Sequence, residues 1–228
     1  MKTSPAEIVR EYGPFPGVEH VHGVTFDGRY VWFACGDKLH ALDPESGAVV
    51  GAIAVGADAG TASDGKHLFQ IAKDRILKID PHTGRVVATI PAPGGSGDNS
   101  GLAWAEGALW VGQHRGRKIH QVDPETGVVL RTIDSDRLVT GVTWVEGEIW
   151  HATWEGGRSD LRRVDPQTGQ VVERLEMPPG VSVSGLEADG GERFFCGGGG
   201  SGKIRAVRRM GRAAQPSRTG REVRTSRP

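Results

Sequence analysis

The pentapeptide DPESG at residues 43–47 returns as DPHTG at 80–84, DPETG at 123–127 and DPQTG at 165–169. Its aspartates are 37, 43 and 42 residues apart, and two adjacent valines follow each copy within two residues. Proline presets φ in a tight turn, and glycine supplies the positive φ that lets a hairpin close. We therefore interpret each copy as a hairpin turn in an internal repeat.

A second set of turns lies between these copies. Short runs of alternating apolar residues flank both sets, which is the pattern of half-buried strands. Each repeat divides into four strands, named A to D in chain order, and a four-stranded repeat of about 42 residues is typical of a propeller blade. The turns of the second set are Asp27-Gly28, Asp64-Gly65, Glu106-Gly107, Glu146-Gly147 and Asp189-Gly190.

The repeats predict an all-β, five-bladed β-propeller with four-stranded antiparallel blades. The fifth blade lacks a D strand at its end, whereas EIVREY at 7–12 has the pattern of the other D strands. We expect this N-terminal strand to complete the last blade, which closes the ring and removes an open sheet edge. The propeller is expected to occupy residues 1–210, followed by a basic, disordered tail at 211–228. The A strands begin near His22, Gly60, Gly101, Gly141 and Gly185.

Composition excludes several other classes of protein. Glycine accounts for 35 of the 228 residues, about twice its usual share, and glycine destabilises helices. No apolar run approaches the roughly 18 residues of a membrane span, and no apolar secretory signal is visible. The tail carries five arginines and one glutamate in a chain of zero formal charge, so the remaining body is acidic and a poor match for nucleic acid. With only two cysteines, we expect a cytoplasmic, monomeric protein.

The two faces of the predicted ring differ in their loops. The A–B and C–D turns on one face are short and repetitive, and we interpret them as structural. The D–A and B–C loops on the other face are irregular, and function usually sits on variable loops of a repeated scaffold. We therefore expect a small-molecule or peptide site on this D–A/B–C face. Its candidate residues are His20, His22, Asp37, Asp98, Asn99, His114, Arg115, Trp154 and Glu155.

Proton transfer and cation binding are the chemistries that these residue types favour. His20 and His22 are two residues apart on an extended segment and point to the same side, as a metal pair or a base with a helper would. Glu155, beside the aromatic wall of Trp154, is a candidate acid/base group or metal ligand, with Asp98 as a second ligand. A divalent cation, Mg²⁺ or Ca²⁺, is a candidate cofactor.

Other candidates would bind substrate. Asn99 offers an amide, His114 with Arg115 offers a site for an anion, and His20 and Trp154 would also contact the substrate. Asp37, near the first B strand, is a further candidate catalytic carboxylate. The alternative for each residue is a solvated loop side chain.

Two cysteines add a further candidate. We place Cys35 and Cys196 at equivalent positions, at the ends of the B strands of blades 1 and 5, which are neighbours in a closed ring. Such a pair would suit a soft metal or a reactive thiol, and the alternative is two small buried apolar residues.

One family resemblance concerns the first repeat. The segments HGVTFDG at 22–28, VWFA at 31–34 and DKL at 37–39 resemble a repeat of the virginiamycin B (streptogramin) lyases. The resemblance implies that His22 is a general acid or base and that glutamates on the same face hold a magnesium ion. Those lyases have seven blades, and Cys35 stands about where a glutamate is expected, which leaves Glu155 in the equivalent loop of blade 4.

A second resemblance covers residues 7–209. Their size, blade count and D-x-x-T-G-x-V repeats are similar to those of the five-bladed glutamine cyclotransferases. This resemblance implies conversion of N-terminal glutamine to pyroglutamate by a glutamate in a loop after an early B strand. That loop is Cys35-Gly36-Asp37 here, so Asp37 or Glu155 would supply the carboxylate. A third possibility is a non-catalytic propeller that binds a protein or peptide on the same face.

Overall fold

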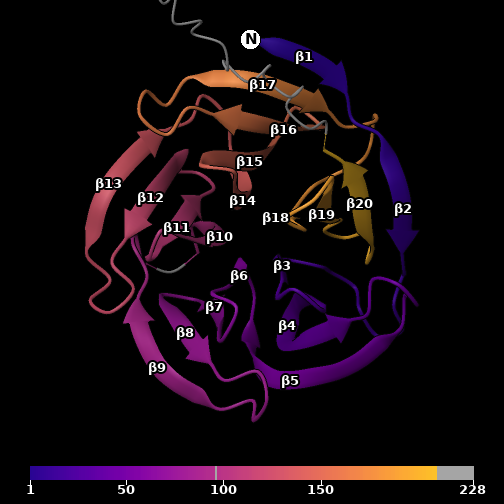
Figure 1. Cartoon of the computed structure of the whole chain (residues 1–228), viewed down its shortest axis with the longest axis vertical. Coiled ribbons are helices and arrows are strands. Elements are labelled where there is room, and N and C mark those ends of the chain that lie inside the picture. The colour runs from indigo at the N-terminus through magenta and orange to yellow at the C-terminus, as the bar shows by residue number, and fades with distance from the viewer. Residues whose placement is uncertain (96, 210–228) are drawn as a thin grey trace, which may run out of the picture.

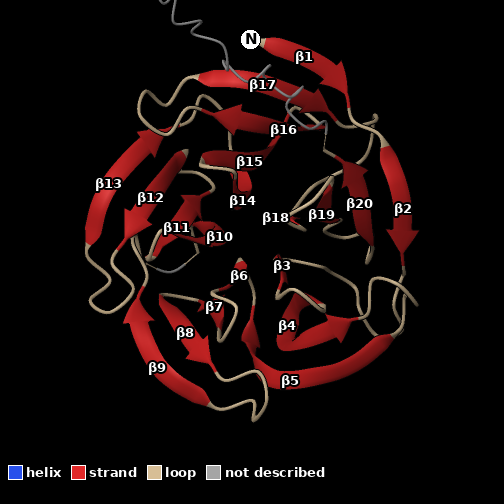
Figure 2. Ribbon diagram, viewed as in Figure 1, coloured by secondary structure: helices blue, strands red, loops and turns tan. Residues whose placement is uncertain are grey.

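The computed structural model describes residues 1–95 and 97–209, which form twenty strands. The strands lie around a central axis as five sheets (Figure 1), and turns and loops join them (Figure 2). The predicted all-β, five-bladed propeller is confirmed. These residues contain no helix, and hence none long and apolar enough to span a membrane. The predicted tail at 211–228 lies outside the described residues.

Blades 2 to 4 contain four antiparallel strands each, running in chain order from the axis outward. Blade 2 consists of β6 (Thr61–Ser63), β7 (Leu68–Ala72), β8 (Arg75–Ile79) and β9 (Val86–Pro91). Blade 3 consists of β10 (Asn99–Ala105), β11 (Ala108–Gln113), β12 (Lys118–Val122) and β13 (Val129–Asp134). Blade 4 consists of β14 (Val139–Val145), β15 (Glu148–Glu155), β16 (Arg158–Val164) and β17 (Val171–Glu176).

Blade 1 differs in one respect, because its predicted B and C strands and the loop between them form one continuous element. The first half of this element pairs with the A strand and its second half with the D strand, so the blade keeps the expected order. Blade 1 consists of β3 (Val24–Phe26), β4 (Val31–Leu42) and β5 (Val49–Ala57).

The N-terminal segment contributes to two blades. Strand β2 (Ile8–Tyr12) pairs antiparallel with β20 and forms the outer edge of blade 5, the place that the sequence analysis assigns to it. Strand β1 (Lys2–Pro5) pairs in parallel with β17 as a fifth strand of blade 4, which the sequence analysis did not anticipate. The other strands of blade 5 are β18 (Gly185–Ala188), β19 (Arg193–Gly197) and β20 (Ile204–Arg208).

The repeated pentapeptide forms the C–D turns through local hydrogen bonds. In blade 3, one carboxylate oxygen of Asp123 accepts the backbone N–H groups of Glu125 at 3.0 Å and Thr126 at 2.8 Å. Gly127 then donates its N–H to the Asp123 carbonyl at 2.9 Å and has a φ of 75°, which favours glycine. Because these partners lie within the pentapeptide, this turn can be predicted from sequence.

Five apolar clusters fill the gaps between adjacent blades and form the core. At the axis, the A strands approach so closely that only glycine fits. A Cβ atom on Gly60 would lie 2.4 Å from the Leu102 nitrogen, and one on Gly141 would lie 2.5 Å from the Leu186 nitrogen. The ring leaves no room for a water molecule, so it separates the D–A/B–C side from the A–B/C–D side. This glycine ring consists of Gly23, Gly60, Gly101, Gly141 and Gly185.

Candidate functional site

Both predicted histidines lie on the D–A/B–C face at the seam between blades 5 and 1. The backbone N–H of His22 donates to the carbonyl of Ala34 at 2.9 Å, which holds this residue beside the first B strand. The rings of His20 and His22 stack with their centroids 5.5 Å apart. A Cβ atom on Gly200 would lie 3.2 Å from the His20 ring, so His20 also reaches the B–C loop of blade 5. The seam therefore presents two adjacent imidazoles.

Burial shifts the pKa values of two titratable groups at this seam. His22 is half-buried, and burial, with a smaller contribution from His20, lowers its pKa below the ordinary 6.5. Its imidazole is therefore neutral at neutral pH and can accept a proton. Burial also raises the pKa of the Cys35 thiol, with the charge of Asp37 as the next cause, so this thiol is a weak nucleophile. The Asp37 side chain itself is exposed.

Asp98 supports a loop of blade 3. Its two carboxylate oxygens accept the backbone N–H groups of Arg115 at 2.7 Å and Gly116 at 3.0 Å, and its carbonyl accepts the N–H of His114 at 2.7 Å. The Nδ1 atom of His114 lies 3.1 Å from the Val139 carbonyl, which makes it the protonated ring nitrogen. These residues are thus close together, but their mutual contacts shape the loop, and the Arg115 side chain is exposed.

Asn99 is the buried member of this group. Only 8% of its surface is exposed, and its Nδ2 atom donates to the Gly95 carbonyl at 3.0 Å. Its Oδ1 atom is buried and has no hydrogen-bond partner among the described residues. Asn99 therefore offers one acceptor, although the surrounding side chains leave it little exposure to a substrate.

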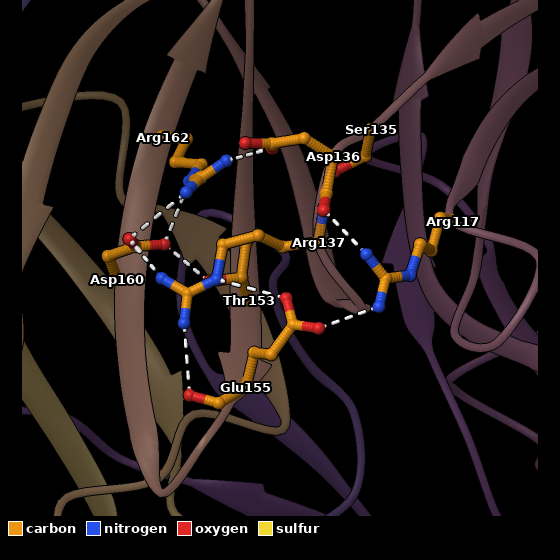
Figure 3. A network of polar contacts seen from close by, with 8 residues as sticks. All are labelled: Arg117, Ser135, Asp136, Arg137, Thr153, Glu155, Asp160 and Arg162. Carbon is orange, nitrogen blue, oxygen red and sulfur yellow. Dashed lines mark hydrogen bonds and ion pairs between the residues drawn. The ribbon is translucent and has the colours of Figure 1, made fainter.

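Glu155 belongs to a network of ion pairs between blades 3 and 4 (Figure 3). Its carboxylate lies 2.6 Å from Nη2 of Arg117 and 3.4 Å from Nε of Arg137, and its carbonyl accepts from Arg137 at 3.0 Å. The Arg137 guanidinium also forms an ion pair with the buried carboxylate of Asp160 at 2.9 Å, and Arg162 forms another with the same carboxylate at 2.9 Å. The neighbouring Trp154 is half-buried, as is Glu155 itself.

The charges of this network balance. Arg162 also pairs with Asp136, so three arginines face three carboxylates. A divalent cation would have to displace an arginine from Glu155, and the carboxylate of Asp98 already caps a turn. No group of three or more His, Cys, Asp or Glu side chains that could hold a metal ion occurs in residues 1–95 and 97–209. The structure gives no support to Glu155 and Asp98 as metal ligands, nor to the metal-assisted lyase interpretation that depends on them.

The two cysteines are not equivalent in the structure. Cys196 pairs with Leu186 and Phe33 pairs with Val24, and these two A-strand residues each follow a glycine of the ring. Cys196 therefore corresponds to Phe33, and Cys35 lies two residues further along its strand. Cys196 is 1% exposed, and burial raises its pKa to about 12, so it is an apolar core residue. Both cysteines are free thiols.

Glu187 is a titratable residue that the sequence analysis overlooked. It lies on β18, two residues after a glycine of the ring and on the A–B/C–D side. Its carboxyl group accepts hydrogen bonds from Thr25 Oγ1 and the Ala188 N–H at 2.8 and 2.9 Å, and it also contacts the Thr143 hydroxyl. Burial raises its pKa to about 7. The repeat contains a signal for it, because the other blades have Thr or Ala at this position of the A strand.

Comparison with known proteins identifies the fold. No protein-family model matches the sequence, and no curated protein matches it. Among solved structures, the glutaminyl cyclase of Myxococcus xanthus has a TM-score of 0.75 at 20% identity, over 91% of this chain and 97% of that chain. The chain thus shares its propeller fold with this glutaminyl cyclase. At this identity the similarity concerns the fold alone.

Two further matches are more distant. A chain of the mitotic checkpoint complex has a TM-score of 0.57 at 12% identity, over 88% of this chain and 91% of that chain. The hydrazine synthase of Kuenenia stuttgartiensis has a TM-score of 0.51 at 18% identity, over 78% of this chain and 55% of that chain. These proteins differ widely in activity, as expected for a fold that hosts many functions.

Proposed function

We propose that the seam between blades 5 and 1 on the D–A/B–C face binds a small molecule or the end of a peptide, with His22 as the proton-transfer group. The observation that carries this proposal is the half-buried, neutral His22, stacked on His20 and fixed by its backbone hydrogen bond. A neutral imidazole near the axis combines a free acceptor with partial exclusion of water, as a general base requires.

The reaction to test first is cyclisation of an N-terminal glutamine. The α-amine attacks the side-chain carboxamide carbon, a C–N bond forms, and ammonia leaves. The amine loses one proton and the departing nitrogen gains one, so a single imidazole can take the proton and return it. The similarity of the propeller to that of glutaminyl cyclase supports this choice. Neither Asp37, which is exposed, nor Glu155, which is paired with arginines, offers a free buried carboxylate, so we assign the transfer to His22.

A peptide assay with His22 variants tests the proposal. Peptides with an N-terminal glutamine should release ammonia, and His22→Asn should lower that rate about a hundredfold or more. His120→Asn, a histidine on β12 whose pKa burial also lowers, is the control and should leave the rate unchanged. The wild-type rate should fall on the acid side with a midpoint below the ordinary histidine pKa of 6.5, because the base is lost on protonation.

Other outcomes separate the alternatives. Peptide binding that His22→Asn weakens, without ammonia release, would favour a non-catalytic propeller that binds a peptide at the same seam. Ammonia release that persists in His22→Asn, or peptides that neither bind nor react, would contradict the proposal.

A further inference from the structure

A large hollow lies on the A–B/C–D side, between blades 1 and 2. Its volume is about 780 Å³, and it is separate from the histidine seam, because the glycine ring closes the axis between the two sides. Turns of both blades form its rim, and one wall contains Trp32. Its lining includes Arg29, Tyr30, Trp32, Ala41, Gly51, Ser63 and Lys66.

The sheet register shows which residues of the other blades correspond to this wall. In each blade, the residue two positions after the ring glycine pairs with one aromatic residue of the B strand. Trp32, Phe69 and Trp110 therefore occupy the same position in blades 1, 2 and 3. The pairs are Thr25–Trp32, Ala62–Phe69 and Ala103–Trp110.

The next blade normally fills the gap beside this aromatic ring. The third residue after the ring glycine is a tryptophan in blades 3 and 4, and it stacks on the B-strand aromatic of the preceding blade. In blade 2 this third residue is Ser63, so the filling side chain beside Trp32 is missing. The stacked pairs are Phe69–Trp104 at 5.2 Å and Trp110–Trp144 at 5.3 Å between ring centroids.

Small residues also replace the outer side chains of this wall. Two residues before the turn aspartate, blade 1 has Ala41, which pairs with Gly51. The corresponding pair in blade 3 is Gln121 and Arg131, and the Arg131 guanidinium covers Trp110 at 5.2 Å from its ring. Together with Ser63, these truncations account for the hollow at this gap.

Two cations, Arg29 and Lys66, and two carboxylates, Asp27 and Asp80, line the hollow. The guanidinium of Arg29 lies over the Tyr30 ring at 4.7 Å, and Lys66 is exposed at the opposite turn. Neither forms an ion pair within the part of the chain that the structure describes. Both carboxylates accept backbone N–H groups of their own turns, Asp27 from Tyr30 at 2.7 Å and Asp80 from His82 at 2.9 Å. Asp27 also accepts the Trp32 indole N–H at 2.6 Å. The indole is thus held in place, and the 7% of Trp32 that is exposed offers carbon surface without a hydrogen-bond donor.

We propose that the hollow between blades 1 and 2 binds a small anionic molecule with a planar ring. Trp32 and Tyr30 would contact the ring, and Arg29 and Lys66 would hold the carboxylate or phosphate group. This site is independent of the proposed peptide reaction at His22.

Titration with two probes tests the proposal. Adenosine 5′-monophosphate and indole-3-acetate combine a planar ring with a phosphate and a carboxylate respectively. Adenosine, which lacks the anionic group, and inorganic phosphate, which lacks the ring, are the control compounds. At least one of the two anionic ring compounds should shift the indole N–H signal of Trp32 in an NMR spectrum, and the shift should saturate with concentration. Adenosine and inorganic phosphate should bind at least about tenfold more weakly.

Two variants connect the signal to the hollow. Ser63→Trp restores the residue that blades 3 and 4 carry, so it should fold and weaken binding at least about tenfold. Lys66→Glu should do the same without altering the core, and it serves if Ser63→Trp fails to fold. Lys118→Ala, an exposed lysine of blade 3, is the control and should bind normally. Absence of saturable binding by both probes, or unchanged binding in Lys66→Glu, would overturn the proposal.

Discussion

Glu187 lies where blades 4, 5 and 1 meet, and its carboxyl group accepts hydrogen bonds from two threonine hydroxyl groups. Thr25 and Thr143 come from the two neighbouring blades, so the contact joins three A strands. Burial raises the pKa from 4.5 to about 7, which means that the folded protein keeps a proton that the unfolded chain releases between these values. Raising the pH through this window therefore removes stability, and the loss is complete above the folded pKa.

Glu187→Gln should remove this pH dependence. We expect the variant to melt about 2–4 °C above the wild type at pH 8, with little difference at pH 4.5. This corresponds to a gain of roughly 1 kcal/mol in the free energy of unfolding, a small value because Glu187 is half-buried and solvent screens its charge. Thermal unfolding at both pH values measures it, with the exposed Glu125→Gln as the control. Equal melting temperatures of variant and wild type at pH 8 would contradict the assignment.

At the scale of single elements, the A strands depend on the glycine ring. Around Gly60 the three atoms nearest to an added Cβ are all backbone atoms of blade 3, at 2.4 to 2.8 Å. No flexible side chain can move aside, so the strand itself would have to shift. The repeated glycine therefore reflects close approach of neighbouring blades, and it has ordinary strand geometry at this position.

Gly60→Ala should consequently destabilise the ring by about 1–3 kcal/mol, the usual range for overpacking. Chemical denaturation provides the measurement. Gly56→Ala in β5 is the matched control, since its Cβ would meet only Ala72 at 3.6 Å, an ordinary contact. A loss of stability in Gly56→Ala as large as that in Gly60→Ala would show that strand propensity is responsible, and the ring geometry is not.

At the scale of the whole molecule, the N-terminal segment joins the last two blades. Strand β2 completes blade 5 and its Tyr12 hydroxyl donates to the Pro44 carbonyl of blade 1 at 2.9 Å, so it spans the closure of the ring. Strand β1 adds only four residues to the outer edge of blade 4, where Lys2 pairs with Glu173 at 3.4 Å. The two strands therefore differ in how much of the core depends on them.

Truncation separates the two contributions. Removing residues 2–5 should lower the free energy of unfolding by about 1–2 kcal/mol, because an edge strand is lost. Removing residues 2–12 should open the ring and expose the edge of β20, with aggregation or loss of cooperative unfolding. Calorimetry and light scattering distinguish these results. A cooperative, monomeric protein after the longer truncation would show that closure does not require β2.

Sequence reasoning succeeded where the partners are neighbours in the chain. The C–D turns were predictable because Asp123 bonds to the next few residues, and the blade number followed from repetition of such turns. The repeats also contain signals for two features of the structure, since Ser63 stands where two other blades have tryptophan and Glu187 stands where they have Thr or Ala. These exceptions can be recognised only when the strand register is known, because the register shows which positions of the blades correspond.

The turns, the strand periodicity and hence the five-bladed ring can be predicted from the chain, because they depend on backbone conformations and alternation within a few residues. The roles of the polar side chains depend on contacts between blades and emerge only in the folded ring. Glu155 is paired because Arg117 and Arg137 come from other loops, and His22 is neutral because burial lowers its pKa. The pairing of β1 with β17 could not be predicted because the partners are more than 160 residues apart in the chain. Burial and charge pairing depend on distances between blades, and those distances exist only after the ring has closed.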